Sequence, residues 1–220
     1  MKELNKYIDH TLLTPTATPE DIVHLCSEAK EYRFYSVCVN SCYVYLAANE
    51  LKDSDVKVAA TVGFPLGAAS AKAKMAEAKK AIKQGADEID MVLNIGFLKS
   101  SLVKSVREEI SAVKKVIGKK VLKVIIETCY LSNAEKKMAC EIIKKAGADF
   151  VKTSTGFGEG GAQISDIQLI KATLGKNTKI KASGGIKSHE EALAFIEAGA
   201  DRIGTSSGIK LLYSSKQKQL

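Results

Sequence analysis

Short runs rich in β-branched residues alternate with longer amphipathic segments along the whole chain. This alternation is typical of repeated βα units, in which strands of a parallel sheet are connected by helices. Eight such units can be counted in the 220 residues. The expected strands lie at residues 7–12, 36–39, 56–62, 88–95, 121–127, 150–153, 179–183 and 202–205.

The tripeptide Gly-Ala-Asp stands at three joints between an expected helix and the next strand, at 85–87, 147–149 and 199–201. Glycine readily adopts the left-handed conformation that closes a helix, so the units look structurally equivalent. Eight equivalent units in 220 residues predict an α/β fold, a (β/α)8 TIM barrel near the lower size limit of such barrels, which forms a single domain over residues 1–220. An open doubly wound sheet is the alternative, but no GxGxxG fingerprint follows the first expected strand.

Capping patterns mark where several helices should begin. Thr18 is expected to be an N-cap, because Pro19 after it suits the first helical position. A serine followed three residues later by Glu or Gln predicts a capping box. Three such pairs occur, at Ser132 and Glu135, Ser165 and Gln168, and Ser188 and Glu191.

The formal net charge is +8 and the isoelectric point is about 9.1. The lysines are scattered along expected helices, which indicates solvated faces and argues against nucleic-acid binding, while a basic balance suits small phosphorylated substrates. The N-terminal residues MKELNKYIDH lack a signal-peptide apolar run, and no stretch approaches the roughly 18 apolar residues of a membrane span. We expect a cytoplasmic protein with no membrane or nucleic-acid partner. A homo-oligomer, dimer or tetramer, is compatible with the sequence.

Five cysteines, at positions 26, 38, 42, 129 and 140, form no CxxC pair and no zinc-like spacing with the three histidines. We therefore expect reduced thiols and no metal site. Cys38 lies in the apolar run SVCV, where burial is the simpler explanation and a thiol that faces a functional site is the alternative.

Charged residues occupy strand positions that should face the barrel interior. In a barrel, alternate strand residues face the surrounding helices and must be apolar, and the others point inward. The apolar alternation from Ile89 to Ile95 leaves Asp90 inside. The same rule places four further charged residues there, namely Lys123, Glu127, Lys152 and Lys181. Isolated charges in a low-dielectric interior are costly, so this set requires either an ion-pair network or a catalytic task.

For Lys123 and Glu127 both interpretations stay open. Lys152 and Lys181 precede glycine-containing loops at the C-terminal barrel face, where such enzymes place their chemistry. Two close lysines disfavour each other's protonation and burial acts in the same direction, so one of them should be a neutral amine. A neutral amine attacks a carbonyl to give an iminium, which permits cleavage or formation of a carbon–carbon bond, and Asp90 can relay the protons. This chemistry needs no cofactor.

Segments 183–185 and 204–208 offer backbone N–H groups and hydroxyls after the last two expected strands, which is where such barrels bind phosphate. Each segment alone is also explained by ordinary turn chemistry. Together they predict a phosphate site made of Gly184, Gly185, Gly204, Ser206 and Ser207.

At these residues the sequence resembles the deoxyribose-phosphate aldolases, a family of class I, Schiff-base-forming aldolases. The matching segments run through nearly the whole chain: IDHTLL at 8–13, GADEIDMVLNIG at 85–96, LKVIIET at 122–128, GADFVKTSTGFG at 147–158, IKASGGI at 180–186 and RIGTSSG at 202–208. The resemblance implies reversible cleavage of 2-deoxy-D-ribose 5-phosphate to acetaldehyde and D-glyceraldehyde 3-phosphate.

The same resemblance implies roles for individual residues. Lys152 would form the Schiff base, with Asp90 and Lys181 as proton donors and acceptors. Asp9 and Thr155 would lie near the sugar hydroxyls, where Lys123 and Cys38 are further candidates for substrate contact, and the phosphate would lie at Gly184, Gly185, Ser206 and Ser207. Some family members carry a basic residue where this chain has Phe157, and some end in a tyrosine that reaches the site, whereas this chain ends in KQKQL.

Two alternatives to this aldolase remain at the level of the sequence. One is another phosphosugar barrel enzyme, transaldolase-like or an isomerase. The other is a non-catalytic protein that binds phosphosugars or nucleic acid, which the charge of +8 would motivate.

Overall fold

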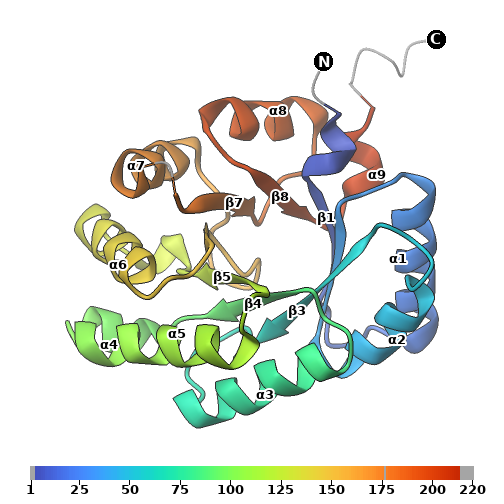
Figure 1. Ribbon diagram of the computed structural model, residues 1–220. Coiled ribbons are helices and arrows are strands. Elements are labelled where there is room, and N and C mark those ends of the chain that lie inside the picture. Colours follow the sequence, from blue (N-terminus) through green and yellow to red (C-terminus); the bar gives the residue numbers. More distant parts are fainter. Residues whose placement is uncertain (1–2, 176, 214–220) are drawn as a thin grey trace.

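The computed structural model describes residues 3–175 and 177–213, and its strands form a closed parallel barrel in the order β1 to β8. Each strand pairs with the next, and β8 pairs with β1 to close the ring. Figure 1 shows the strands at the centre and the helices around them. The predicted (β/α)8 barrel is therefore confirmed. The strands are β1 (Ile8–Leu12), β2 (Ser36–Val39), β3 (Lys57–Val62), β4 (Glu88–Val92), β5 (Val121–Ile125), β6 (Phe150–Lys152), β7 (Lys179–Ser183) and β8 (Arg202–Thr205).

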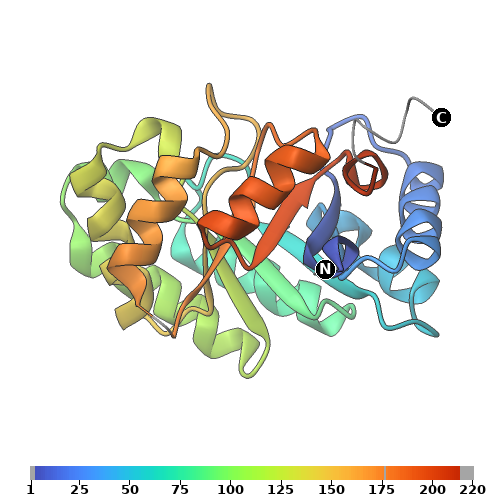
Figure 2. The ribbon, with the colours of Figure 1, turned by 90° about the horizontal axis from the view of Figure 1, so that it is seen from above.

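Helices connect the strands on the outside of the barrel. The α-helices are α1 (Pro19–Glu31), α2 (Val44–Glu50), α3 (Ala71–Lys83), α4 (Ile95–Lys99), α5 (Val103–Ile117), α6 (Asn133–Lys145), α7 (Ile164–Leu174), α8 (His189–Ala198) and α9 (Gly208–Leu211), and the short 3-10 turns are η1 (Leu4–Tyr7), η2 (Ser41–Tyr43) and η3 (Thr128–Tyr130). Figure 2 shows α7 (orange) and α8 (red-orange) packed against the outside of the barrel wall. Over residues 3–175 and 177–213, no helix has the length and apolar character needed to cross a membrane.

The main hydrophobic core lies between the strands and the helices. Ile89, Met91 and Leu93 are fully buried there, in one cluster with Val106 and Ile110 of α5. Burying an aliphatic side chain of this size contributes about 1.5–3 kcal/mol, so these outward-facing residues fix the strands from outside. The other face of each strand is then free to carry charged side chains inward.

The three Gly-Ala-Asp joints share one geometry. Their glycines all have positive φ, at 108° for Gly85, 78° for Gly147 and 119° for Gly199. At each joint the aspartate backbone N–H donates to a residue of the preceding strand, and its carboxylate accepts from a backbone N–H close by. Each joint therefore closes a helix and attaches the new strand to its neighbour, as the repeat predicts.

Helix starts agree with the sequence patterns at three of four sites. Thr18 caps α1 in a capping box with Asp21, and the predicted boxes that begin at Ser132 and Ser188 are both present. The box predicted at Ser165 is wrong, because α7 begins at Ile164 and Ser165 therefore lies inside the helix. The backbone N–H of Ala162 donates to Gly184 O, and this long-range contact leads the chain into the helix before Ser165.

Three strands end earlier than predicted, and β6 does so by one residue, at Lys152. β4 stops at Val92, because the Asn94 side chain caps α4 by accepting from the N–H of Phe97. β5 stops at Ile125, and Glu127 adopts a left-handed backbone conformation with φ of 51°. Residues 214–220, which hold the KQKQL tail, lie outside the described residues.

Candidate active site

A pocket of about 580 Å³ opens at the C-terminal end of the barrel strands. Its walls come from the segments that follow β1, β6, β7 and β8, and Lys152 contributes to its lining from the end of β6. The lining comprises Thr11–Pro15, Lys152, Thr155–Gly161, Ser183–Lys187 and Gly204–Ser207. This is the barrel face at which the sequence predicts the chemistry.

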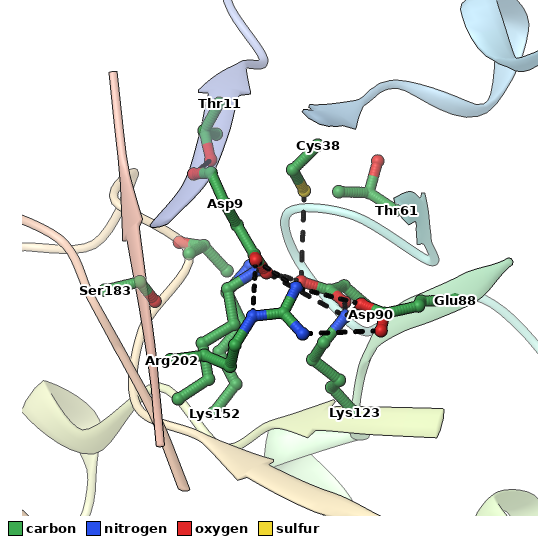
Figure 3. A network of polar contacts seen from close by, with 12 residues as sticks. Asp9, Thr11, Cys38, Thr61, Glu88, Asp90, Lys123, Lys152, Ser183 and Arg202 are labelled. Atoms are coloured by element: carbon green, nitrogen blue, oxygen red, sulfur yellow. Dashed lines mark hydrogen bonds and ion pairs between the residues drawn. The ribbon is translucent and has the colours of Figure 1, made fainter. Parts of the chain in front are cut away.

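Three lysines converge on the carboxylate of Asp90 inside the barrel (Figure 3). Lys123 Nζ lies 2.6 Å from Oδ1, while Lys152 Nζ and Lys181 Nζ lie 2.9 and 2.8 Å from Oδ2. The Cys38 thiol approaches the same Oδ2 at 3.8 Å. The inward orientation predicted for these side chains is thus what the structure shows.

Asp9, Glu88 and Arg202 extend this cluster further into the barrel. Lys181 Nζ is 2.5 Å from Asp9 Oδ2, and Lys123 Nζ is 2.5 Å from Glu88 Oε2. The Arg202 guanidinium donates to both Asp9 and Glu88, and it stacks 3.4 Å from the centre of the Tyr35 ring. All members of the cluster are buried, and it contains four basic and three acidic side chains: Lys123, Lys152, Lys181 and Arg202 against Asp9, Glu88 and Asp90.

The cluster sets the protonation of its members. Burial alone would raise the pKa of Asp90, but the surrounding lysines outweigh it and hold that pKa well below the usual value. Burial would likewise lower the pKa of Lys181, yet the carboxylates of Asp9 and Asp90 raise it. The sequence argument that burial helps to discharge a crowded lysine therefore does not apply to Lys181, because two anions compensate for its desolvation.

Glu127 lies apart from this cluster, contrary to the prediction that it converges with the interior lysines and Asp90. Its carboxylate accepts from the N–H of Thr155 at 3.1 and 3.2 Å and from the Thr155 hydroxyl. Burial raises the pKa of Glu127, and the hydrogen bonds from Thr155 and the charge of Lys152 oppose that rise. Among the ion pairs of the described residues, none joins Glu127 to a lysine.

The predicted site residues fall into two groups. Thr155 and the five predicted phosphate residues line the pocket. Asp9, Lys123 and Cys38 are fully buried and do not contribute to its lining, so their predicted contact with substrate stays a prediction. Burial raises the pKa of the Cys38 thiol, which therefore stays protonated.

Two relevant residues escaped the sequence reasoning. Arg202 carries the charge that pairs with Asp9 and Glu88, and it could have been found because Ile203 next to it faces outward. Lys187 is an exposed lysine in the pocket wall, and its signal is its position directly after the glycine pair and Ile186.

The described residues offer no cluster of three or more His, Cys, Asp or Glu side chains that could hold a metal ion. The five cysteines are all free, and Cys26, Cys38 and Cys140 are buried. Burial raises the pKa of Cys26 and of Cys140 to about 12, so both behave as packing residues.

A parallel barrel whose pocket contains a lysine held against a buried carboxylate defines an enzyme of the aldolase class. The chain belongs to the family described as DeoC/LacD family aldolase, whose model matches residues 4–213. It is 60% identical over 210 residues to a deoxyribose-phosphate aldolase of Finegoldia magna, covering 96% of this chain and 99% of that one. It is 56% identical over 223 residues to the deoxyribose-phosphate aldolase of Caldanaerobacter subterraneus, covering 100% and 96%.

Solved structures give the same result. A putative deoxyribose-phosphate aldolase from Coccidioides immitis superposes with a TM-score of 0.95 at 40% identity, covering 99% of this chain and 86% of that one. The deoxyribose phosphate aldolase from Aeropyrum pernix, described as a unique tetramer, gives a TM-score of 0.88 at 34% identity, covering 98% and 91%. These likenesses support the aldolase prediction and do not support the transaldolase-like, isomerase or non-catalytic alternatives.

Proposed function

We propose that this protein is a class I aldolase that reversibly cleaves 2-deoxy-D-ribose 5-phosphate to acetaldehyde and D-glyceraldehyde 3-phosphate through a Schiff base on Lys152. The observation that carries the proposal is the position of Lys152, which lines the pocket while its Nζ lies 2.9 Å from Asp90 Oδ2. The other two lysines around Asp90 do not reach the pocket lining. Lys152 is therefore the amine that a substrate carbonyl can meet.

Lys152 has the fewest ion-pair contacts of the three lysines around Asp90. Lys181 and Lys123 each contact two carboxylates at close range, whereas Lys152 shares one oxygen of Asp90 with Lys181. Attack on a carbonyl requires a neutral amine, and use of Lys152 as that amine disturbs the fewest ion pairs of the cluster.

The chemistry follows from that neutral amine. Lys152 Nζ adds to the C1 aldehyde of the open-chain sugar, and loss of water from the carbinolamine gives an iminium. Removal of the proton from the C3 hydroxyl breaks the C2–C3 bond, whose electron pair moves toward the iminium nitrogen to give an enamine and releases glyceraldehyde 3-phosphate. Protonation of the enamine at C2 and hydrolysis of the resulting iminium release acetaldehyde and restore the lysine.

Lys181 and Asp90 divide the proton transfers in this proposal. Lys181 holds its proton firmly between Asp9 and Asp90, so it supplies the nearby positive charge and is the available proton donor. Although burial alone would raise the pKa of Asp90, the lysines around it hold that pKa low and keep the group ionised, so its carboxylate is free to take up a proton directly or through water. Asp9 and Lys123 act through these two residues, because they are fully buried and paired with them.

The substrate phosphate is placed by the walls that follow β7 and β8. Gly184 and Gly185 have positive φ and turn their segment beside the pocket, and Ser206 and Ser207 face it from the next loop. Exposed Lys187 in the same wall provides a cation for the phosphate. Thr155 lines the pocket in the segment after β6 and is the candidate contact of the sugar hydroxyls.

Reductive trapping tests this proposal. The protein is incubated with acetaldehyde and sodium borohydride, digested, and its peptides are mapped by mass spectrometry. One ethyl group on Lys152 is expected, together with production of glyceraldehyde 3-phosphate from deoxyribose 5-phosphate in a coupled assay. An unmodified Lys152 peptide, or a label on another lysine alone, contradicts the mechanism.

We also propose that the protein forms a homo-oligomer and works in the cytoplasm. A structural relative is described as a tetramer, which supports an assembly of copies without fixing its size here. The free cysteines fit a reducing compartment. Size-exclusion chromatography with light scattering measures the first property, and fractionation of the source cells measures the second.

A further inference from the structure

The segment 155–161, which we call the glycine loop, forms one wall of the pocket. Its first residue, Thr155, is hydrogen-bonded to Glu127. Both carboxylate oxygens of Glu127 lie within hydrogen-bond distance of the Thr155 N–H. Oε2 also accepts a hydrogen bond from the Thr155 hydroxyl. The Thr155 Oγ1 accepts in turn from the N–H of Phe157 at 3.0 Å. A short chain of hydrogen bonds thus runs from the Glu127 carboxylate into the first turn of the loop.

The far end of the loop has its own anchor. The N–H of Ala162 donates to Gly184 O at 3.0 Å, and a Cβ on Gly161 would lie 2.2 Å from the same oxygen. The loop is therefore held at its start by Glu127 and at its end by the wall that follows β7. Residues 156–160 span the pocket edge between these two anchors.

The middle of the loop rests directly on the same carboxylate. A Cβ on Gly158 would lie 3.1 Å from Glu127 Cδ and 2.9 Å from Cys129 Sγ, so only glycine fits there without a shift of those groups. Glu127 itself has φ of 51°, a conformation that residues other than glycine hold only when their surroundings enforce it. The bonds to Thr155 stabilise this backbone, and the backbone aims the carboxylate at the loop.

We propose that Glu127 is a positioning residue whose carboxylate holds Thr155 and the glycine loop against the pocket, and so sets the affinity for the sugar phosphate. It acts through Thr155 and not on the amine chemistry of Lys152. The inference rests on the function proposed above, because affinity is judged with deoxyribose 5-phosphate. It separates Glu127 from Lys123, which belongs to the ion-pair cluster.

Kinetics of four single variants and one double variant test the route through Thr155. In Glu127→Ala the charged hydrogen bonds to Thr155 are lost, and we expect KM for deoxyribose 5-phosphate to rise about tenfold or more, with kcat within about threefold of the parent. Glu127→Gln keeps one acceptor and should show a smaller rise in KM. Thr155→Ser keeps the hydroxyl and should raise KM less than Thr155→Val does. The double variant Glu127→Ala/Thr155→Val should be no worse than the worse single variant, since the two residues act as one unit.

Hydrogen exchange of the loop amides provides a readout that does not depend on turnover. In Glu127→Ala the amides of residues 156–160 should exchange at least about tenfold faster than in the parent, and those of β6 should be unchanged. Asp166→Asn is the matched control, because Asp166 is also a buried carboxylate close to the loop but pairs with Lys136. Its loop amides and its KM should match the parent.

The outcomes separate the two proposals. Unchanged exchange and KM in folded Glu127→Ala overturn the role of Glu127, and so do additive effects in the double variant. A loss of borohydride trapping at saturating acetaldehyde also overturns it, because it would place Glu127 in the amine chemistry. If Glu127→Ala does not fold, the same comparisons are made with Glu127→Gln. A parent protein that does not cleave deoxyribose 5-phosphate refutes the proposed function, and the exchange experiment still decides whether Glu127 orders the loop.

Discussion

Lys152 and Lys181 are register partners on neighbouring strands, and both point their Nζ atoms at one oxygen, Oδ2 of Asp90. The two lysines differ in their remaining partners, because Lys181 also contacts Asp9 at 2.5 Å while Lys152 faces the pocket. The extra carboxylate helps to raise the pKa of Lys181, which therefore keeps its proton, and Lys152 is the lysine that a substrate carbonyl can reach.

Replacement of Lys152 by leucine should abolish cleavage of deoxyribose 5-phosphate, with kcat/KM lower by at least about 10³-fold, because no other pocket lysine contacts Asp90. The coupled assay measures the loss, and borohydride trapping should leave residue 152 unlabelled. Lys144→Leu, at an exposed lysine of α6, is the control and should keep full activity. Retention of even a tenth of the activity in Lys152→Leu would contradict the Schiff-base role.

Replacement of Lys181 by leucine should lower both activity and stability. Lys181 is fully buried between Asp9 and Asp90, so its loss leaves these anions short of a partner at a cost of about 3–5 kcal/mol. This cost depends on the contact with Asp9, which only the structure shows. Loss of the proposed proton donor should also lower kcat.

Urea unfolding and the coupled assay on Lys181→Leu measure both effects. Lys181→Arg serves as the comparison, because it keeps the positive charge between Asp9 and Asp90 and should lose less stability than Lys181→Leu. A Lys181→Leu protein with the stability and the kcat of the parent would refute both roles.

The sequence predicted the strands and the inward-facing residues of the site, but it did not predict the charge state of Lys181 or the start of α7. Strands β2, β7 and β8 have the predicted bounds, since their apolar alternation has a period that only a strand satisfies. The same alternation placed Asp90, Lys152 and Lys181 inside. The charge state of Lys181 depends on its distance from Asp9, on a strand far away in the sequence, and no local pattern encodes that distance. The start of α7 likewise depends on the contact between Ala162 and Gly184.

Acid should remove the stability that Asp90 contributes. Its folded pKa lies well below the ordinary value of 3.8 because of the lysines around it. A carboxyl with a depressed folded pKa contributes stability that is present above its unfolded pKa and is lost as pH falls toward its folded pKa. The gap in unfolding free energy between the parent and Asp90→Asn should therefore shrink below about pH 4, by up to about 1.4 kcal/mol per pH unit.

Urea titrations of both proteins between about pH 6 and pH 2 measure that gap. Carboxyl groups away from Asp90 are common to both proteins, so their acid dependence cancels in the gap. A gap that stays constant down to about pH 2 would show that the lysines do not depress the pKa of Asp90.

The glycines of the Gly-Ala-Asp joints should differ in their tolerance of alanine. At Gly147 the backbone has φ of 78° and no atom lies within 4 Å of an added Cβ, so Gly147→Ala should cost only the left-handed strain of about 1–2 kcal/mol. At Gly85 an added Cβ would lie 2.6 Å from Ala48 Cβ of α2, so Gly85→Ala adds an overpacking cost of about 1–3 kcal/mol. Gly118→Ala also meets open space but should cost more than Gly147→Ala, because ψ of −122° puts Gly118 outside the left-handed helical region. Urea unfolding ranks the three variants, all of which should keep the parent kcat because the joints lie away from the pocket lining. Equal losses of unfolding free energy in Gly85→Ala and Gly147→Ala would show that α2 moves to make room for the added methyl group at no cost in stability.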